Sequence, residues 1–175
     1  MPVEISCDVK GGVRQARELR AAAIKLLELI GLEKVELSLL LTDDRRIAQI
    51  NHTYRRQSGP TDVLSFSQLE RPDGEVPDVD EVPDVDKDSS RPPGLNLIGD
   101  VVISLETAAR QAREMDQSVS GRLRTLLVHG VLHLMGLDHE RSAADAKVMF
   151  AVQDRLEIKL ESAAAPQPTS RKGAR

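Results

Sequence analysis

Three histidines gather in one short stretch, VHGVLHLMGLDHE, at residues 128–140. His129 and His133 are four residues apart, and His139 follows after Gly136. Residues four apart on a helix share a face, so both imidazoles can reach one ion. Gly136 can end the helix and turn the chain back, which brings His139 to the same ion. The spacing therefore predicts a metal site with three protein ligands and one open position, the arrangement of catalytic zinc sites.

The flanking residues favour a metal over simple packing of the histidines. The segment TLLVHGVLHLM (125–135) is apolar on nearly every side, which predicts a buried central helix. Burying two imidazoles there without partners would cost roughly 1–3 kcal/mol each. A metal ion satisfies both rings.

The spacing is also that of the peptidase motif H-E-x-x-H, but Gly130 occupies the position of the glutamate. Peptide cleavage needs a carboxylate there to move a proton, and glycine supplies none. We expect the glycine to leave room beside the ion for a larger substrate. Phosphodiester cleavage suits such a site, because a metal and a nearby cation can stabilise the charge that develops on a phosphoryl group.

Strand and helix patterns alternate along the chain around this stretch. Strands are predicted over 3–7, 35–43, 61–67 and 95–104. Helices are predicted over 16–30, from Asp43 or Asp44 to Tyr54, from Ser104 to Met115, from Ser118 or Ser120 to Gly136, and over 142–160. This order indicates an α/β (α+β) fold with a mixed four-stranded sheet surrounded by about five helices. The metal site is expected at the end of a central helix.

One domain is predicted over residues 1–161, since 175 residues with 40% hydrophobic content can form a single core. Residues 71–93 contain the acidic repeat EVPDVD twice and too few large apolar side chains to fold alone, so we expect an insertion loop. Residues 162–175 are expected to be a disordered basic tail.

Composition excludes some classes of site and leaves others open. The single cysteine, Cys7, rules out an intrachain disulfide and a thiolate metal cluster. A net charge of −4 argues neither for nor against a polyanionic partner. No signal peptide is recognised, and no apolar run approaches the roughly 20 residues that cross a bilayer, so a cytoplasmic protein is expected.

Three segments resemble the signatures of the YbeY family of endoribonucleases, which act in ribosomal RNA maturation. The first is HGVLHLMGLDH at 129–139, which resembles H-G-x-L-H-L-x-G-Y-D-H. The second is INHTYRRQSGPTDVLSFS at 50–67, which resembles L-N-x-x-Y-R-x-x-x-x-P-T-D-V-L-S-F-P. The third is LIGDVVIS at 97–104, which resembles L-G-D-I-V-I-S. The chain departs from these patterns at Leu137 (usually tyrosine), at Ser67 (usually proline) and in its acidic repeat.

The resemblance implies a function and the roles of four residues. It implies a single-strand-specific endoribonuclease that processes the 3′ end of small-subunit ribosomal RNA and acts in ribosome quality control. His129, His133 and His139 would be the zinc ligands, although three imidazoles also suit Ni²⁺, Co²⁺ or Cu²⁺. Arg55 would be the functional cation, because a guanidinium grips phosphate oxygens in pairs and stays charged. The fold implied is a small α/β domain with a four-stranded sheet.

Other residues are candidates for supporting roles. Asp138 and Asp100 can accept the second N–H of a ligand histidine. Alternatively, Asp138 caps a turn and Asp100 ends a strand pairing. RNA recognition usually relies on aromatic stacking, and this chain has one Tyr, two Phe and no Trp. Basic side chains are therefore expected to carry most of the affinity through phosphates. These candidates are Arg56, Arg17, Arg20 and Arg14.

Two alternative functions remain open on the sequence. One is a metallopeptidase that uses another carboxylate, such as Asp138, as its base. The other is a non-catalytic, zinc-stabilised assembly factor that docks on the small ribosomal subunit or its proteins.

Overall fold

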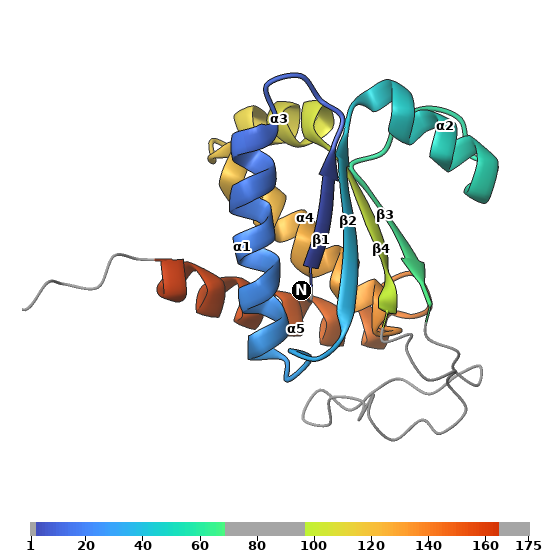
Figure 1. Cartoon of the computed structure of the whole chain (residues 1–175). Coiled ribbons are helices and arrows are strands. Elements are labelled where there is room, and N and C mark those ends of the chain that lie inside the picture. The colour runs from blue at the N-terminus through green and yellow to red at the C-terminus, as the bar shows by residue number, and fades with distance from the viewer. Residues whose placement is uncertain (1–2, 69–96, 165–175) are drawn as a thin grey trace, which may run out of the picture.

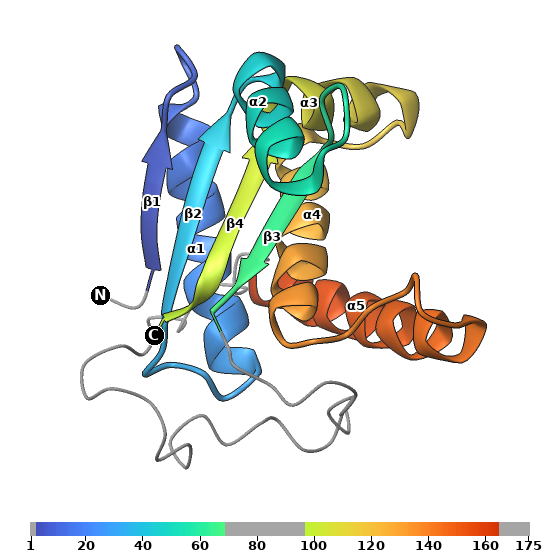
Figure 2. The ribbon, with the colours of Figure 1, turned by 90° about the vertical axis from the view of Figure 1, so that its right-hand side faces the viewer.

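The chain forms one mixed four-stranded sheet, as predicted, made of β1 (Val3–Cys7), β2 (Glu36–Thr42), β3 (Val63–Ser67) and β4 (Leu97–Ser104). In the sheet, the strands follow the order β1-β2-β4-β3 (Figures 1 and 2). The computed structural model describes residues 3–68 and 97–164. β1 pairs with β2, and β2 with β4, in parallel, whereas β3 runs antiparallel to β4. The helices are α1 (Val13–Leu29), α2 (Asp44–Arg55), α3 (Leu105–Glu114), α4 (Val119–Leu134) and α5 (Ala143–Ala164).

Side-chain caps begin three of the helices where the sequence predicts them. The Asp43 carboxylate accepts the Arg46 N–H at 2.7 Å, and the Ser118 hydroxyl accepts the Gly121 N–H at 3.0 Å. Ser104 caps α3 in the same way. Each cap satisfies a backbone donor that the first helical turn leaves unpaired.

Helix α4 is the centre of the helical layer. It packs against β3 and β4 on one side and against α1, α3 and α5 on the others. α1, α4 and α5 lie behind the sheet in the view of Figure 2, and α2 lies in front of its upper part. The side chains of Leu123, Leu127 and Leu132 are almost fully buried in this core. The predicted buried central helix is confirmed.

The end of α5 lies beyond the predicted domain boundary. The helix continues to Ala164, and the Ser162 hydroxyl donates to the Ile158 carbonyl at 2.8 Å, one turn back. The helix thus runs past the boundary expected at residue 161, and the alanines at its end are strong helix formers. The insertion at 71–93 and the tail after 164 lie outside the described residues. No helix in the described ranges is long and apolar enough to cross a membrane.

Asp44 joins α2 to the start of α3. Its Oδ1 accepts the hydroxyls of Ser104 at 2.5 Å and Thr107 at 2.6 Å, and its Oδ2 lies 3.2 Å from Arg110 Nη1. Burial raises the pKa of this carboxyl, but the two hydroxyls and Arg110 outweigh burial and leave the pKa below its ordinary value of 3.8. Asp44 thus stabilises the fold in its charged form.

We expect Asp44→Ala to lower the unfolding free energy by about 2 kcal/mol, because two buried hydroxyls lose their acceptor. The melting temperature should fall by about 4–8 °C. Since the folded-state pKa is depressed, this contribution is present above about pH 4 and is lost as the pH falls through the lower, folded-state value. Thermal unfolding of both proteins between pH 7 and pH 3 measures it. A stability difference that stays constant over that range would contradict the assignment.

Candidate metal centre

The three histidine rings converge at the C-terminal end of α4. The ring centroids of His129 and His133 are 4.7 Å apart, and each lies 5.2 Å from the ring of His139. One nitrogen from each ring lies within 4.8 Å of the others. The Nε2 atoms of His129 and His133 are 3.1 Å apart, close to the spacing of two nitrogens that each lie about 2.0–2.1 Å from one tetrahedral ion. The three histidines are therefore positioned to bind a metal.

Gly136 makes this convergence possible. Its φ of +90° lies in the left-handed region, and it stops the helix just after Met135. The Leu137 N–H then bonds the Leu132 carbonyl at 3.1 Å, which closes the helix end. The chain reverses, and His139 returns to the face that carries the other two rings. The predicted role of this glycine is confirmed.

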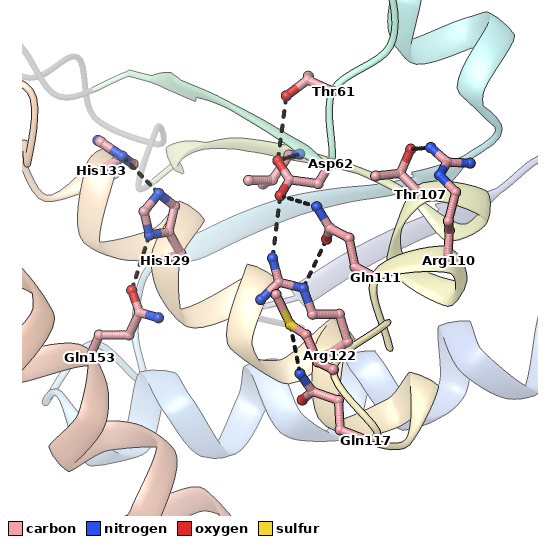
Figure 3. A network of polar contacts seen from close by, with 12 residues as sticks. Thr61, Asp62, Thr107, Arg110, Gln111, Gln117, Arg122, His129, His133 and Gln153 are labelled. Carbon is pink, nitrogen blue, oxygen red and sulfur yellow. Dashed lines mark hydrogen bonds and ion pairs between the residues drawn. The ribbon is translucent and has the colours of Figure 1, made fainter. Parts of the chain in front are cut away.

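Gln153 of α5 orients the His129 ring through a hydrogen bond (Figure 3). His129 Nδ1 lies 3.0 Å from the Gln153 amide oxygen, so Nδ1 carries the proton and Nε2 is left free for an ion. The Gln153 amide nitrogen donates to Glu157 at 2.9 Å, and Glu157 accepts the Thr125 hydroxyl at 2.9 Å. Gln153 was not predicted from the sequence. A donor set of neutral imidazole nitrogens with one ring held in a fixed tautomer fits a divalent transition metal.

The surroundings of His133 keep its ring neutral. Burial, helped by the nearby His129, His139 and Arg55, lowers the pKa of His133 to about 4, although Asp138 opposes the shift. At neutral pH the ring nitrogen therefore keeps its lone pair, which is the form that binds a metal.

Beside the histidines lies a cleft of about 490 Å³. Arg55, at the end of α2, lies in its wall and brings a positive charge close enough to influence His133. The other lining residues come from the segment before β3, from β3 itself and from the turn after α4. They are Gln57, Thr61, Asp62, Val63, Ser65, Asp138 and Glu140. The structure thus brings Arg55 and the three histidines, all singled out in the sequence analysis, to one cavity.

Asp62 lines the same cleft as the three histidines and is held by several polar contacts (Figure 3). Its Oδ1 accepts the Val63 N–H at 2.8 Å, and its Oδ2 accepts Gln111 Nε2 at 3.1 Å and lies 3.4 Å from Arg122. Arg122 also donates to Gln111 at 2.9 Å. Arg122 was not predicted from the sequence. It lies seven residues before His129 on α4 and so shares a helical face with it, a signal that could have identified Arg122.

Gly130 does not open the site as expected from the sequence. A Cβ atom at this position would lie 2.8 Å from Val101 Cγ1 and 3.1 Å from Ser65 Oγ. The position is buried and faces the sheet, because it is one residue on from His129 and so points about 100° away around the helix. The expectation of extra room beside the ion was wrong. The glycine instead lets α4 pack closely on β3 and β4.

We expect Gly130→Ala to lower the unfolding free energy by about 1–2 kcal/mol, because overpacking against the rigid Val101 outweighs the roughly 1 kcal/mol gain in helix propensity. Gly130→Glu should lower the unfolding free energy more than Gly130→Ala does, and it should create no peptidase activity. Thermal unfolding measures the first effect. Gly121→Ala in the same helix is the matched control, because its added methyl meets only the Ser118 hydroxyl at 3.1 Å before more distant atoms. An equal loss in both variants would contradict this account.

The two predicted partners of the ligand histidines lie on different sides of the sheet. Asp138 lines the cleft, but its Oδ1 accepts the Glu140 N–H at 2.9 Å and its Oδ2 lies 3.6 Å from Arg141. It caps the turn, which is the second role that the sequence allowed. Asp100 lies on β4 and lines a groove on the opposite face of the sheet. Side chains alternate along a strand, so Asp100 points away from the histidines when Val101 points toward them.

The predicted RNA-binding arginines are not all brought to the cleft. Arg56 follows Arg55 and caps α2 in the left-handed conformation, with φ of +55°. Arg17 and Arg20 lie on α1, and Arg20 Nε donates to the Val3 carbonyl of β1 at 3.2 Å. β1 and β3 are opposite edges of the sheet, so these two residues are not part of the cleft beside β3.

Comparisons with known proteins agree with this geometry. A family model described as Endoribonuclease YbeY matches residues 7–161. The chain is 43% identical to an Endoribonuclease YbeY of Anaeromyxobacter dehalogenans, over 89% of this chain and 70% of that protein. It is 40% identical to the Endoribonuclease YbeY of Persephonella marina, over 79% of this chain and 78% of that protein. The solution structure of TM1509 from Thermotoga maritima has the same fold, with a TM-score of 0.60 and 23% identity over 99% of each chain.

Proposed function

The chain belongs to the YbeY family, and from this premise we propose that it is a metal-dependent endoribonuclease, a hydrolase that cleaves phosphodiester bonds in single-stranded RNA. The relatives named Endoribonuclease YbeY support the activity and the RNA substrate. The single observation that supports it most in the structure is one cavity that holds three convergent histidines and Arg55.

Residues in and beside the cleft would have separate roles in the reaction. His129, His133 and His139 would hold the ion, which supplies a Lewis acid beside the bound phosphate. The Arg55 guanidinium binds phosphate oxygens in pairs and stabilises the negative charge that builds up during cleavage. Gln153 keeps the His129 ring in one tautomer and orientation. Asp62, tied to Gln111 and Arg122, fixes the backbone in this part of the cleft wall.

We further propose zinc as the native metal, with Ni²⁺ or another divalent transition metal able to replace it in vitro. The neutral nitrogen donors suit these ions better than Mg²⁺ or Ca²⁺, which prefer oxygen. The substrate proposed is ribosomal RNA, at the 3′ end of the small-subunit molecule, with the small subunit and its proteins as cytoplasmic partners and ribosome quality control as a related role. Membership of the family supports these assignments.

RNA cleavage with and without a chelator tests the function. We expect the purified protein to cut an unstructured RNA, to lose this activity after metal removal, and to regain it when about one equivalent of Zn²⁺ per chain is added. A duplex of the same sequence should be cut much more slowly. RNA cleavage that survives complete metal removal would overturn the proposal. So would cleavage of peptides in the absence of any cleavage of RNA.

A further inference from the structure

The aromatic residues of this chain are few, and two of them adjoin residues of the candidate site: Phe150 contacts His139, and Tyr54 precedes Arg55. The sequence has one Tyr, two Phe and no Trp. The Phe150 ring stacks on the ligand His139, with centroids 5.6 Å apart and planes 19° apart. Tyr54 directly precedes Arg55, and its ring packs edge to face with that of Phe66, with centroids 5.2 Å apart. This clustering calls for an explanation beyond core packing, because both Tyr54 and Phe150 are exposed to solvent.

Phe150 presents an open aromatic surface beside the metal ligands. It lies on α5, where it is 47% exposed, while its neighbour Met149 is buried in the core. Contact with His139 fixes the plane of the Phe150 ring. A ring held at a fixed angle next to a phosphate-binding site is placed to stack against the base of a bound nucleotide.

Tyr54 presents a second aromatic surface on the other side of β3. It is 69% exposed and borders a groove of about 560 Å³ on the sheet face that α2 partly covers. β3 is the edge strand, with α2 in front of the sheet and α4 and α5 behind it (Figure 2). The last turn of α2 therefore joins the two hollows, with Tyr54 at the groove and Arg55 in the cleft.

The described lining of the cleft offers few positive side chains to RNA phosphates, so base contacts would add affinity. Arg55 is the single basic side chain among the lining residues that the structure describes, alongside the carboxylates of Asp62, Asp138 and Glu140. Asp62 and Asp138 are partly neutralised by arginines outside the lining. Among the described lining residues and the proposed ion, only Arg55 and that ion attract phosphates at this cleft, and stacking on aromatic rings would add affinity for any base.

We propose that Phe150 and Tyr54 are base-stacking platforms for single-stranded RNA, one on each side of the phosphate that Arg55 binds. This inference rests on the proposed endoribonuclease function and deepens it. It also changes an expectation from the sequence, since stacking replaces a broad basic groove that would include α1. A duplex, whose bases are already stacked, cannot use these platforms, so they favour single strands.

Binding of two matched probes tests the proposal on the metal-loaded full-length protein. One probe is a fluorescein-labelled 2′-O-methyl oligouridylate of about eight nucleotides, and the other is the same backbone without bases. The integrity of both probes is checked on gels after each titration. We expect the wild type to bind the first probe at least about tenfold more tightly. Phe150→Ala and Tyr54→Ala should each weaken that binding at least about fivefold and leave binding of the abasic probe unchanged.

Control variants separate stacking from structural damage. Ile158→Ala, at an exposed apolar position on the same helix as Phe150, should bind both probes like the wild type. Phe150→Tyr and Tyr54→Phe keep an aromatic ring, so both variants should retain the base-dependent binding of the wild type. Metal content is measured for every variant, because Phe150 contacts His139.

The proposal is overturned if the wild type binds both probes equally, or if the alanine variants lose affinity for both probes alike. Metal-dependent cleavage of ordinary RNA is measured in parallel. If that cleavage persists while base-dependent binding is missing, the stacking platforms are wrong and the endoribonuclease function stands. If cleavage is missing as well, the proposed function itself fails.

Discussion

His133→Ala is expected to reduce RNA cleavage by at least about 1000-fold, because the remaining two imidazoles cannot hold the ion in the cleft. His133 lies between the other two ligands in the sequence, and its nitrogen is 3.1 Å from that of His129. Its low pKa shows that the site favours the neutral ring even without an ion's help. Metal content by elemental analysis should fall from about one equivalent per chain to near zero.

His52→Ala is the matched control for this experiment. His52 is the fourth histidine of the chain, lies exposed on α2 and does not line the cleft. It should keep full metal content and full cleavage. If His133→Ala retained both as well, with normal circular dichroism, the three-histidine site would not be the catalytic centre.

Arg55→Ala is expected to lower kcat by about 100- to 1000-fold while metal content stays unchanged. Arg55 reaches the cleft from α2, whereas the metal ligands come from α4 and the turn after it, so its loss removes a charge without disturbing the ion. Arg55→Lys should recover only part of the rate, since an ammonium cannot form the paired hydrogen bonds of a guanidinium. Single-turnover cleavage with saturating enzyme measures the effect on the chemical step.

Arg56→Ala tests whether any positive charge near the cleft would serve. Arg56 is the next residue, but it caps α2 in the left-handed conformation and does not line the cavity. We expect a small increase in KM and nearly unchanged kcat. Equal losses of kcat in the Arg55 and Arg56 variants would argue for general attraction of RNA rather than a catalytic guanidinium.

Local signals in the sequence predicted much of this structure. The caps at Asp43 and Ser118 and the left-handed turn at Gly136 are properties of a few neighbouring residues, and each lies where the sequence placed it. The convergence of the three histidines follows from helical periodicity and that one glycine. Such features depend on geometry within a turn or two, which periodicity alone can resolve.

Features that depend on packing between elements were missed or misplaced. The alternation of β4 is visible in the sequence, but the sequence does not say which face α4 covers, and so Asp100 was placed with the histidines. Gly130 was interpreted as space for a substrate because its neighbour Val101 could not be known. Arg17 and Arg20 were grouped with Arg55 in one basic groove because the strand order that separates β1 from β3 is a property of the whole sheet. Gln153 was missed because the rotation of α5 about its axis is set by docking alone.

The contacts of α5 with two of the three histidines would couple metal binding to the packing of this helix. Gln153 hydrogen-bonds His129 and Phe150 stacks on His139, so the positions of two of the three rings depend on the packing of α5. Thermodynamic reciprocity then requires that occupancy of the site tightens this helix by as much as the helix tightens the site. If the three histidines bind a metal as proposed, loss of the ion would loosen α5 and make it more accessible to proteases.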